Sequence, residues 1–439
     1  MKKTKIVIIG AAGRDFHNFN LIYRDNPKYQ VVAFTANQIP DISNRYYPKE
    51  LSGKLYPDGI PIYDEKNLEK IIEENSVDEC ILAYSDLSYD AVMHLCSRVV
   101  AYNAKFSVLG ATQTMLVSTK PVIAVLAVRT GCGKSQTTRA VVSILKQAGK
   151  KVVCVRHPMP YGDLKKQKIQ RFETLADLEK HECTIEEMEE YEPHINMDSI
   201  VYAGVDYELI LGRAEKEADI IVWDGGNNDT SFYRPNLTIV VADPLRPGHE
   251  LKYYPGEINL LLTDVIIVNK VNSAKDKDIN LIIQNAKKLN PQALIIKAKS
   301  EILVEHPQYI RGKKVLVIED GPTLTHGEMT IGAGTVAARI NKASQIIDPR
   351  PYILGKIKQT FQKYPNIGHV LPAMGYGQEQ LEDLEKTINN VPADAVVIGT
   401  PIDLQRFIKI KKPATRVKYD LDKTAVGLLK KILKAKKFI

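Results

Sequence analysis

The sequence predicts an α/β protein of two or three domains built around parallel sheets. Apolar runs of strand length alternate with longer amphipathic segments along almost the whole chain, which is typical of parallel sheets covered by helices. Glycine-rich turns follow two of these runs, in KIVIIGAAG and in VLAVRTGCGKS. The length of 439 residues also exceeds what one compact core usually holds.

Composition and charge exclude several classes of protein. Hydrophobic residues make up 44% and charged residues 26%, which rules out a disordered or fibrous chain. The net charge of +8 is spread along the sequence, so we expect no nucleic-acid partner. No run approaches the ~20 apolar residues of a membrane span, and the apolar run near the start is too short for a signal peptide. The five cysteines form no C-x-x-C pair, so we expect reduced thiols and a cytoplasmic protein.

The first block, residues 1–119, predicts a Rossmann-like domain. Its strands are expected at KIVIIG, VVAFTA, DECILAYS and KFSVLG, with helices between them. A G-x-x-G turn follows the first strand, with Arg14, His17 and Asn18 just after it. No acidic residue ends the second strand, as a ribose contact would require. Binding of NAD, an anion or regulatory site, and simple scaffolding therefore all remain open.

The second and third blocks complete the predicted architecture. Residues 120–347 predict a P-loop NTPase domain with a helical insert at about 163–213; its loop RTGCGKS resembles the loops of the class that includes MinD-type ATPases and dethiobiotin synthetase. Residues 348–439 predict an α/β C-terminal extension packed on the NTPase domain. The dipeptide Lys120-Pro121 marks the first boundary, because a residue before proline avoids the helical conformation.

The most informative stretch is a phosphate-binding loop at residues 129–135. An apolar strand runs into this loop and the loop into a helix, so backbone N–H groups and the helix N-terminus can surround phosphates. The residues expected to bind the nucleotide here are Thr130, Gly131, Cys132, Gly133, Lys134, Ser135 and Gln136. Val128 replaces the first glycine of the usual motif, and Arg129 stands where MinD-type ATPases carry a second lysine that reaches a nucleotide. Lys134 and Arg129 are therefore expected to be catalytic.

Other strand ends supply the remaining candidates. Asp224 follows an apolar run and precedes two glycines, so we expect it to act in catalysis and to hold Mg²⁺ together with Ser135. Asp163 is a candidate second carboxylate. The candidates to hold a substrate phosphate are Arg156, His157, Arg246 and His249.

The base-recognition signal is ambiguous. Asn269 and Lys270 begin an N-K-x-D-like motif after a strand and are expected to contact the nucleotide, but Asn272 replaces the aspartate that accepts hydrogen bonds from guanine. The substitution favours ATP and leaves GTP open.

Together, the segments AVRTGCGKSQTTR, VRHPMPYGDL, WDGGNND and VVADPLRPGHE resemble the cyclic 2,3-diphosphoglycerate synthetase family, which includes members labelled as predicted GTPases. The resemblance covers nearly the whole chain. It implies ATP-driven closure of a phosphoanhydride in 2,3-bisphosphoglycerate, a small anionic substrate, with ADP and phosphate as products. We expect Mg²⁺ as the cofactor and a homodimer as the assembly. A regulatory or chaperone-like GTPase with a protein partner, and a small-molecule kinase with another acceptor, are the alternatives.

Overall fold

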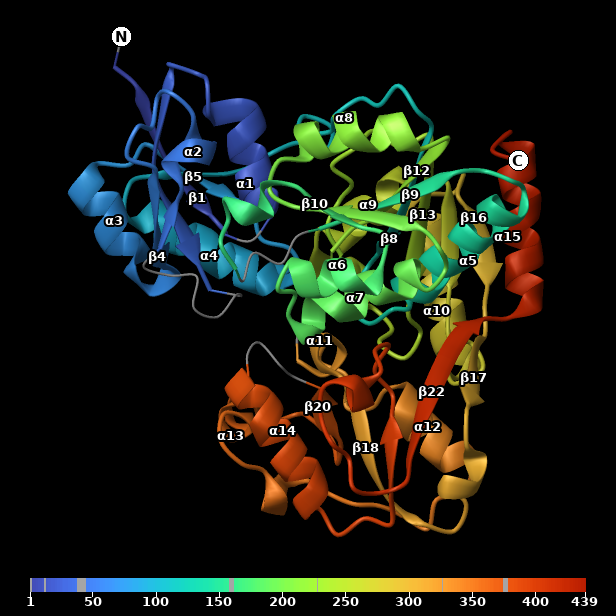
Figure 1. The fold of residues 1–439 in the computed structure, drawn as a ribbon. Helices are drawn as coiled ribbons and strands as arrows, with labels where there is room; N and C mark the ends of the chain where they lie inside the picture. The colour runs from blue at the N-terminus through green and yellow to red at the C-terminus, as the bar shows by residue number, and fades with distance from the viewer. Residues whose placement is uncertain are drawn as a thin grey trace.

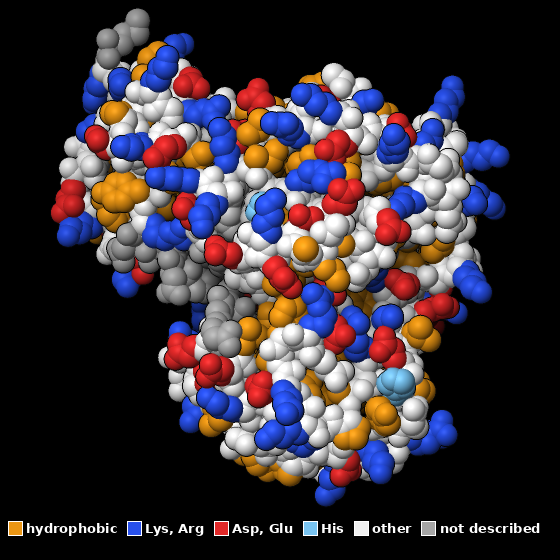
Figure 2. All heavy atoms as spheres, viewed as in Figure 1, with side chains coloured by type: hydrophobic (Ala, Val, Ile, Leu, Met, Phe, Trp, Pro, Cys, Tyr) orange, Lys and Arg blue, Asp and Glu red, His pale blue; other side chains and the backbone are white. Residues whose placement is uncertain are grey.

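The computed structural model describes residues 2–11, 13–37, 45–157, 162–226, 228–325, 327–373 and 378–439. Three sheets of mostly parallel strands follow one another along the chain, each covered by helices (Figure 1). The predicted α/β class with parallel sheets is therefore confirmed. Figure 2 shows that lysine and arginine side chains are scattered among acidic ones over the visible face instead of forming one patch.

The N-terminal domain has three layers, with its sheet in the middle, because the strands of the sheet are apolar on both faces. The order is β3-β4-β2-β1-β5-β7, and every neighbouring pair is parallel except β3 with β4. Ile6 and Ile8 of β1 pack with Phe16 of α1, whereas Val7 and Ile9 face the side covered by α3 and α4. The elements are β1 (Thr4–Ile9), α1 (Arg14–Asn18), β2 (Tyr29–Ala36), β3 (Arg45–Tyr47), α2 (Lys49–Ser52), β4 (Ile60–Asp64), α3 (Leu68–Asn75), β5 (Glu79–Leu82), α4 (Tyr89–Ala101) and β7 (Lys105–Val108).

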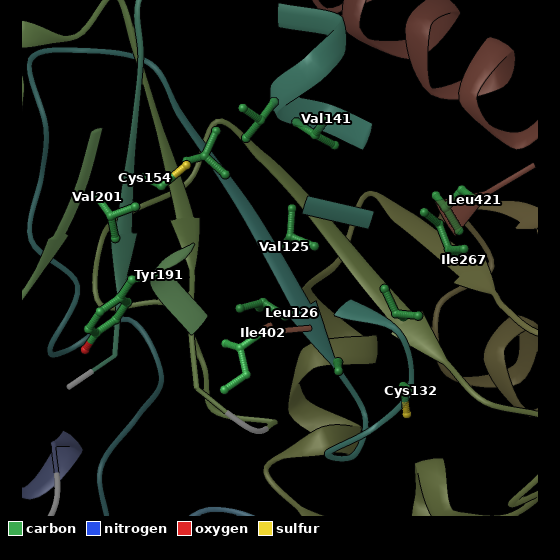
Figure 3. Packing of buried hydrophobic residues seen from close by; sticks show 14 of the residues in the cluster. Val125, Leu126, Cys132, Val141, Cys154, Tyr191, Val201, Ile267, Ile402 and Leu421 are labelled. Carbon is green, nitrogen blue, oxygen red and sulfur yellow. The ribbon is translucent and has the colours of Figure 1, made fainter. Parts of the chain in front are cut away.

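The central sheet is the largest and carries the glycine-rich loop. Its order is β10-β11-β9-β12-β8-β13-β15-β16, and only β10 runs antiparallel to its neighbour. Val125, Cys154 and Val201 come from three of its strands and belong to one buried cluster, with Val141 of α5 in the layer above (Figure 3). The strands are β8 (Val122–Ala127), β9 (Val152–Arg156), β10 (Gln170–Phe172), β11 (Ile200–Ala203), β12 (Ile220–Asp224), β13 (Leu237–Ala242), β15 (Val265–Val268) and β16 (Leu294–Lys297). The covering helices are α5 (Lys134–Gln147), α8 (Tyr207–Glu217), α9 (Gly256–Leu262) and α10 (Asp276–Leu289).

The segment 163–213 contains strands as well as helices. Strands β10 and β11 extend the central sheet beyond β9, while α6 (Leu175–Lys180) and α7 (Ile185–Ile195) lie between them in the sequence. Helix α7 begins with a capping box in which Thr184 and Glu187 satisfy each other's backbone N–H groups. This fixes the start of α7 and therefore which of its side chains face the sheet.

The C-terminal sheet begins well before residue 348, because β17 and β18 already belong to it. Its path is β17-β22-β21-β18-β19, with β20 paired to β18. After β22 the last helix, α15, returns to pack against α5 and β16 (Figure 1). The elements are β17 (Ser300–Val304), β18 (Lys314–Asp320), α11 (Gly321–Leu324), α12 (Ala333–Ile340), β19 (Gln345–Ile346), α13 (Ile357–Lys363), β20 (Leu371–Ala373), α14 (Gln378–Asn390), β21 (Ala395–Ile398), β22 (Ala414–Leu421) and α15 (Lys423–Ala435). Within the described ranges, every helix is too short or too polar to cross a membrane.

The start of α1 docks the N-terminal domain onto the loop after β12. Arg14 forms an ion pair with Asp229 at 2.5 Å, and the His17 ring stacks on Phe232 with centroids 4.1 Å apart. A Cβ added to Gly13 would lie 2.2 Å from the His157 ring, so only glycine permits this approach. The G-x-x-G turn therefore serves a contact between domains, which favours scaffolding among the three readings left open by the sequence.

We predict a pH-dependent loss of stability that originates at His17. Burial, with the neighbouring Arg14 charge adding to it, lowers the pKa of His17 to about 3 from its ordinary 6.5. Below about pH 6.5 the unfolded chain binds a proton here that the folded protein does not, so stability falls as the pH drops toward 3. The His17→Gln variant should lose stability less steeply than wild type between pH 6.5 and 5, by up to about 1.4 kcal/mol per pH unit. Denaturant unfolding followed by the fluorescence of Trp223, the only tryptophan, measures the two slopes.

The matched control is His94→Gln, because His94 is an exposed residue of α4. Its slope should equal that of wild type. Equal slopes for wild type and His17→Gln would contradict the prediction.

Candidate nucleotide-binding site

The loop between β8 and α5 requires both of its glycines. Gly131 and Gly133 have φ values of 80° and 105°, which side chains with a Cβ rarely adopt. A Cβ on Gly133 would in addition lie 2.0 Å from the amide nitrogen of Asn269. The fully buried strand β8 and the first turn of α5 fix the two ends of the loop.

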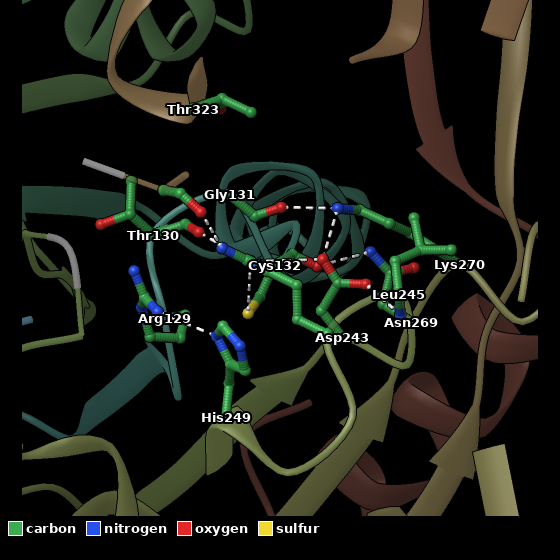
Figure 4. A network of polar contacts seen from close by, with 12 residues as sticks. Arg129, Thr130, Gly131, Cys132, Asp243, Leu245, His249, Asn269, Lys270 and Thr323 are labelled. Atoms are coloured by element: carbon green, nitrogen blue, oxygen red, sulfur yellow. Dashed lines mark hydrogen bonds and ion pairs between the residues drawn. The ribbon is translucent and has the colours of Figure 1, made fainter. Parts of the chain in front are cut away.

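Three consecutive carbonyl groups of this loop each accept a hydrogen bond from a side chain on a neighbouring strand end (Figure 4). The donors and acceptors are Arg246 to Thr130 (2.8 Å), Lys270 to Gly131 (2.6 Å) and Asn269 to Cys132 (3.0 Å). A trans peptide places the N–H that follows each carbonyl on the opposite side of the chain. Among the described residues, the N–H groups of residues 131–133 form no hydrogen bond of normal geometry to another backbone group. They are therefore aligned to bind an anion such as a phosphate.

Asp243, at the end of β13, orients two of these three donors. Its Oδ2 lies 2.8 Å from the Lys270 amine and 3.3 Å from the Arg246 guanidinium. Burial alone would raise the pKa of Asp243, but the charges of Lys270 and Arg246 outweigh it and lower that pKa. A charged carboxylate therefore sits beneath the loop and keeps both cations in place.

A second buried carboxylate, Asp224, gathers the charged groups behind Lys134. Its Oδ1 lies 2.6 Å from the Lys134 amine, and its Oδ2 lies 2.9 Å from both Arg156 and His194. The Thr138 hydroxyl donates to Oδ1 at 3.0 Å. Burial would raise the pKa of Asp224, but the charges of Arg156 and Lys134 hold it well below its usual range.

The same cluster shifts the pKa values of its cations. Burial lowers the pKa of Lys134, and the nearby Arg156 charge lowers it further. Burial also opposes the charged form of His194, but Cys154 and Asp224 outweigh this and raise the pKa of His194 to about 9. Arg156 forms a second ion pair with Glu190. Three cations thus face the two carboxylates Asp224 and Glu190, which leaves one positive charge for a phosphate to neutralise.

Two members of this cluster, Glu190 and His194, come from α7 and were not predicted from the sequence. Helical spacing is the signal that could have found them, because Glu186, Glu190 and His194 stand four residues apart and share one face of the helix. The acidic run EEMEEYEPH is more typical of a solvated helix, yet both Glu186 and His194 are buried.

The loop opens into a partly open cavity between the central and C-terminal sheets. One wall is the loop itself with the start of α5. The opposite wall is contributed by the end of β18, the start of α12 and β22, and α7 adds Glu190. The carboxylates that line it are Glu190, Glu319 and Asp320.

Two of these carboxylates are fixed by backbone N–H groups. Glu319 accepts from the N–H groups of Gly332, Gly334 and Thr335 at the start of α12, at 2.7–3.0 Å. Asp320 accepts from the Thr323 N–H at 3.2 Å. Burial raises the pKa of both carboxyls. The far wall is thus rich in oxygen acceptors, in contrast to the loop, which presents donors.

The residues predicted to hold a substrate phosphate are all engaged within the protein. Arg156 is paired with Asp224 and Glu190, and Arg246 donates to the Thr130 carbonyl. His249 lies 2.9 Å from an Arg129 nitrogen, and His157 is wedged between Gly13 and Gly226. None of the four lines the cavity described above.

Other predicted residues also lie apart from the loop. Asp163 accepts from the Lys165 N–H at 2.9 Å and lines a separate hollow. Asn272 both accepts from the Ser300 N–H (3.1 Å) and donates to the Ser300 carbonyl (3.0 Å), so its amide is committed to the backbone. The identity of residue 272 therefore does not indicate whether the protein binds adenine or guanine.

The residues present fit a Mg²⁺ ion held chiefly by the nucleotide. Ser135 lines the cavity next to Lys134, where a hydroxyl and phosphate oxygens would supply the oxygen ligands that Mg²⁺ prefers. Both oxygens of Asp224 already contact donors, so this carboxylate fits a role through water. Within the described ranges, no group of three or more His, Cys, Asp or Glu side chains forms a metal centre of its own.

Comparison with solved structures gives only distant likenesses. LpxK from Aquifex aeolicus, in complex with ATP, matches with a TM-score of 0.42 and 10% identity over 84% of this chain and 99% of that one. A ParA family ATPase from Chlorobium tepidum matches with a TM-score of 0.24 and 14% identity over 41% and 83% of the two chains. These likenesses are too weak to bear on the site or its chemistry.

Comparison of sequences gives a much nearer relative. No family model matches the chain. The arginine synthetase ArcE of Thermococcus kodakarensis is 60% identical over 432 residues, which cover 98% of this chain and 96% of that protein. At this identity and coverage, the chain belongs to the same family as the synthetase ArcE.

Proposed function

We propose that this protein is an ATP-dependent synthetase that forms arginine. The observation that carries the proposal is the cavity with two unlike walls, a phosphate-binding loop on one side and carboxylates on the other. Such a cavity suits a reaction between an anionic nucleotide and a nitrogen-rich or cationic partner. The 60% identity to a protein named arginine synthetase supports the same conclusion.

The loop side would bind the triphosphate. Because side chains bind the carbonyl groups of residues 130–132 on one side of the loop, the N–H groups of residues 131–133 would face the phosphates on the other side. Lys134 would move from Asp224 to a phosphate oxygen. Ser135 and the phosphate oxygens would hold Mg²⁺, which neutralises charge on the phosphates. Arg156 and His194 would then keep Asp224 charged and in place.

The carboxylate side would bind the acceptor. Arginine carries three nitrogens on its guanidino carbon, so ATP would be used to replace the oxygen of a ureido precursor, citrulline, by ammonia. The ureido oxygen would attack the γ-phosphorus and ADP would leave. Ammonia would then attack the ureido carbon, and inorganic phosphate would leave with the original oxygen. Phosphoryl transfer of this kind relies on positioning and electrostatics.

Glu190 is the residue that we assign to proton transfer in this scheme. Its side chain is 29% exposed, lines the cavity beside Lys134, and is held by the buried Arg156. Ammonium entering this wall would lose one proton to the Glu190 carboxylate before it attacks as ammonia.

The resemblance to cyclic 2,3-diphosphoglycerate synthetases suggests a different acceptor, 2,3-bisphosphoglycerate. Its phosphates would face the Glu190 carboxylate across the cavity, and like charges at such distances repel. The basic residues expected to bind those phosphates are already engaged by internal partners. This acceptor therefore ranks second, and a regulatory GTPase would need no acceptor at all.

The first prediction on function is that ATP turnover requires both citrulline and ammonium. Purified protein with Mg-ATP should produce arginine, ADP and phosphate in equal amounts, measured by amino-acid analysis and coupled assays. With citrulline labelled by ¹⁸O in the ureido group, the label should appear in the phosphate. Stimulation by 2,3-bisphosphoglycerate with a new anhydride signal in ³¹P NMR, or equal ATP hydrolysis with and without any acceptor, would contradict the proposal.

The second prediction concerns Lys134. The Lys134→Met variant removes the amine that contacts phosphate but leaves Asp224 with Arg156, His194 and Thr138. Arginine formation should fall by at least about 10²-fold, because one preorganised charge toward the transition state is lost. The control Lys277→Met, at an exposed position of α10, should retain full activity. Retention of more than half the activity in Lys134→Met would exclude the loop as the nucleotide site.

The third prediction concerns Glu190. The Glu190→Gln variant should lower kcat by about 10²-fold or more, because a general base contributes an effect of that size, while ATP affinity stays within about threefold. Isothermal calorimetry with ATP and steady-state kinetics in ammonium separate the two effects. The matched control is Glu179→Gln, an exposed glutamate of α6. Unchanged kcat in Glu190→Gln would remove this residue from the reaction.

A further inference from the structure

The side chain of Asp86, which belongs to the N-terminal domain, contacts the phosphate-binding loop. This residue follows β5 and adopts a left-handed backbone conformation with φ of 59°. Its N–H donates to the Tyr254 carbonyl at 2.8 Å. The next two residues form β6 (Leu87–Ser88), which pairs antiparallel with β14 (Tyr253–Tyr254) of the central domain. A small two-stranded sheet thus holds Asp86 across the domain boundary.

Both carboxylate oxygens of Asp86 contact the loop. Oδ1 lies 2.6 Å from Nε of Arg129, and Oδ2 accepts from the Thr130 N–H at 3.2 Å and from the Thr130 hydroxyl at 2.6 Å. The side chains of Arg129 and Asp86 are 1% and 2% exposed. An ion pair this deeply buried is strongly sensitive to the loss of either partner.

The remaining contacts of Arg129 fix the direction of its guanidinium. The guanidinium carbon lies 3.4 Å from the centroid of the Tyr253 ring, and one nitrogen lies 2.9 Å from His249. Glu328 lies 3.3 Å away, but its side chain is 55% exposed. The charge of Arg129 is therefore compensated mainly by Asp86. In MinD-type loops the corresponding lysine reaches a nucleotide, whereas here the residue is bound within the chain.

Thr130 is consequently held on both sides of its backbone. Asp86 binds its N–H from the N-terminal domain, and Arg246 binds its carbonyl from the end of β13. Because the carbonyl of Thr130 and the N–H of Gly131 belong to one planar peptide, fixing Thr130 also fixes the direction of the first phosphate-facing N–H. Rotation of this peptide would turn that N–H away from the phosphates.

We infer that Asp86 is a positioning residue of the nucleotide site, and that the N-terminal domain thereby sets the affinity for ATP. This inference rests on the proposed binding of ATP at the loop. It gives the N-terminal domain a role in the nucleotide site in addition to its docking through Arg14 and His17. The role is exerted through Arg129 and Thr130, and not by contact with the reacting atoms.

Two substitutions at Asp86 test the inference by calorimetric titration with ATP and by steady-state kinetics. Asp86→Asn keeps an oxygen acceptor for Thr130 but removes the charge opposite Arg129, and Asp86→Ala removes both. We expect the ATP dissociation constant to rise about tenfold in Asp86→Asn and further in Asp86→Ala. The KM for citrulline should change less than about threefold, because the carboxylate wall does not contact Asp86. Asp90→Asn, an exposed position in the first turn of α4, should behave as wild type.

The outcomes separate the inference from the proposed function. If the wild-type protein does not bind ATP, the proposed function itself fails. If wild type binds ATP and folded Asp86→Asn and Asp86→Ala bind it equally well, only the inference fails. Three other results would show that Asp86 makes only a structural contact and would overturn the inference. They are a fall in the melting temperature with an unchanged ATP dissociation constant, an equal rise in the KM values for ATP and citrulline, and failure of both variants to fold. A rise in the ATP dissociation constant with little change in the KM for citrulline supports the inference.

Discussion

Asp224 is buried at the end of β12 and contacts cations that come from three different elements, Lys134 at the start of α5, Arg156 at the end of β9 and His194 on α7. None of these charges could be buried alone, because an isolated charge in a protein interior is strongly unfavourable. The carboxylate therefore determines where the loop lysine rests and ties α7 to the central sheet. It also leaves the cluster with a surplus of positive charge toward the loop.

The two sides of the cavity differ in the charged groups that they carry. On the loop side, Asp243 pairs in the same way with Lys270 and Arg246, which donate hydrogen bonds to carbonyl groups of the loop. On the far side, the C-terminal sheet brings Glu319 and Asp320 to the opening, each fixed by backbone N–H groups. Cations thus fix the backbone of the loop, whereas the proposed acceptor would meet the wall that carries carboxylates. This polarity favours a nitrogen-rich acceptor over a bisphosphate.

The outer domains complete the site from two directions. The C-terminal sheet shares one continuous apolar core with the central domain, and α15 packs back against α5, so the carboxylate wall is rigidly attached to the loop. The N-terminal domain packs mainly around separate apolar clusters on the two faces of its sheet, and its Asp86 reaches the loop by buried polar contacts. The shared apolar core suits a C-terminal sheet that is fixed relative to the loop. The polar contacts of Asp86 suit a domain that adjusts the position of the loop.

The sequence by itself determined the α/β class, the strand, loop and helix of residues 121–147, and the glycines that the loop requires. These features depend on local properties, namely an unbroken apolar run, glycines where φ is positive and a helix that starts at Lys134. Only the tertiary structure decided what the other charged residues do. Arg156 and Arg246 follow strands just as a phosphate ligand would, but the buried carboxylates of Asp224, on a neighbouring strand, and of Asp243, at the end of the same strand as Arg246, engage them instead. Glu190 and Asp86 lie 56 and 43 residues from Lys134 and Arg129, and no local pattern marks them as neighbours. Pairing of buried charges depends on distances across the fold, which the order of residues does not contain.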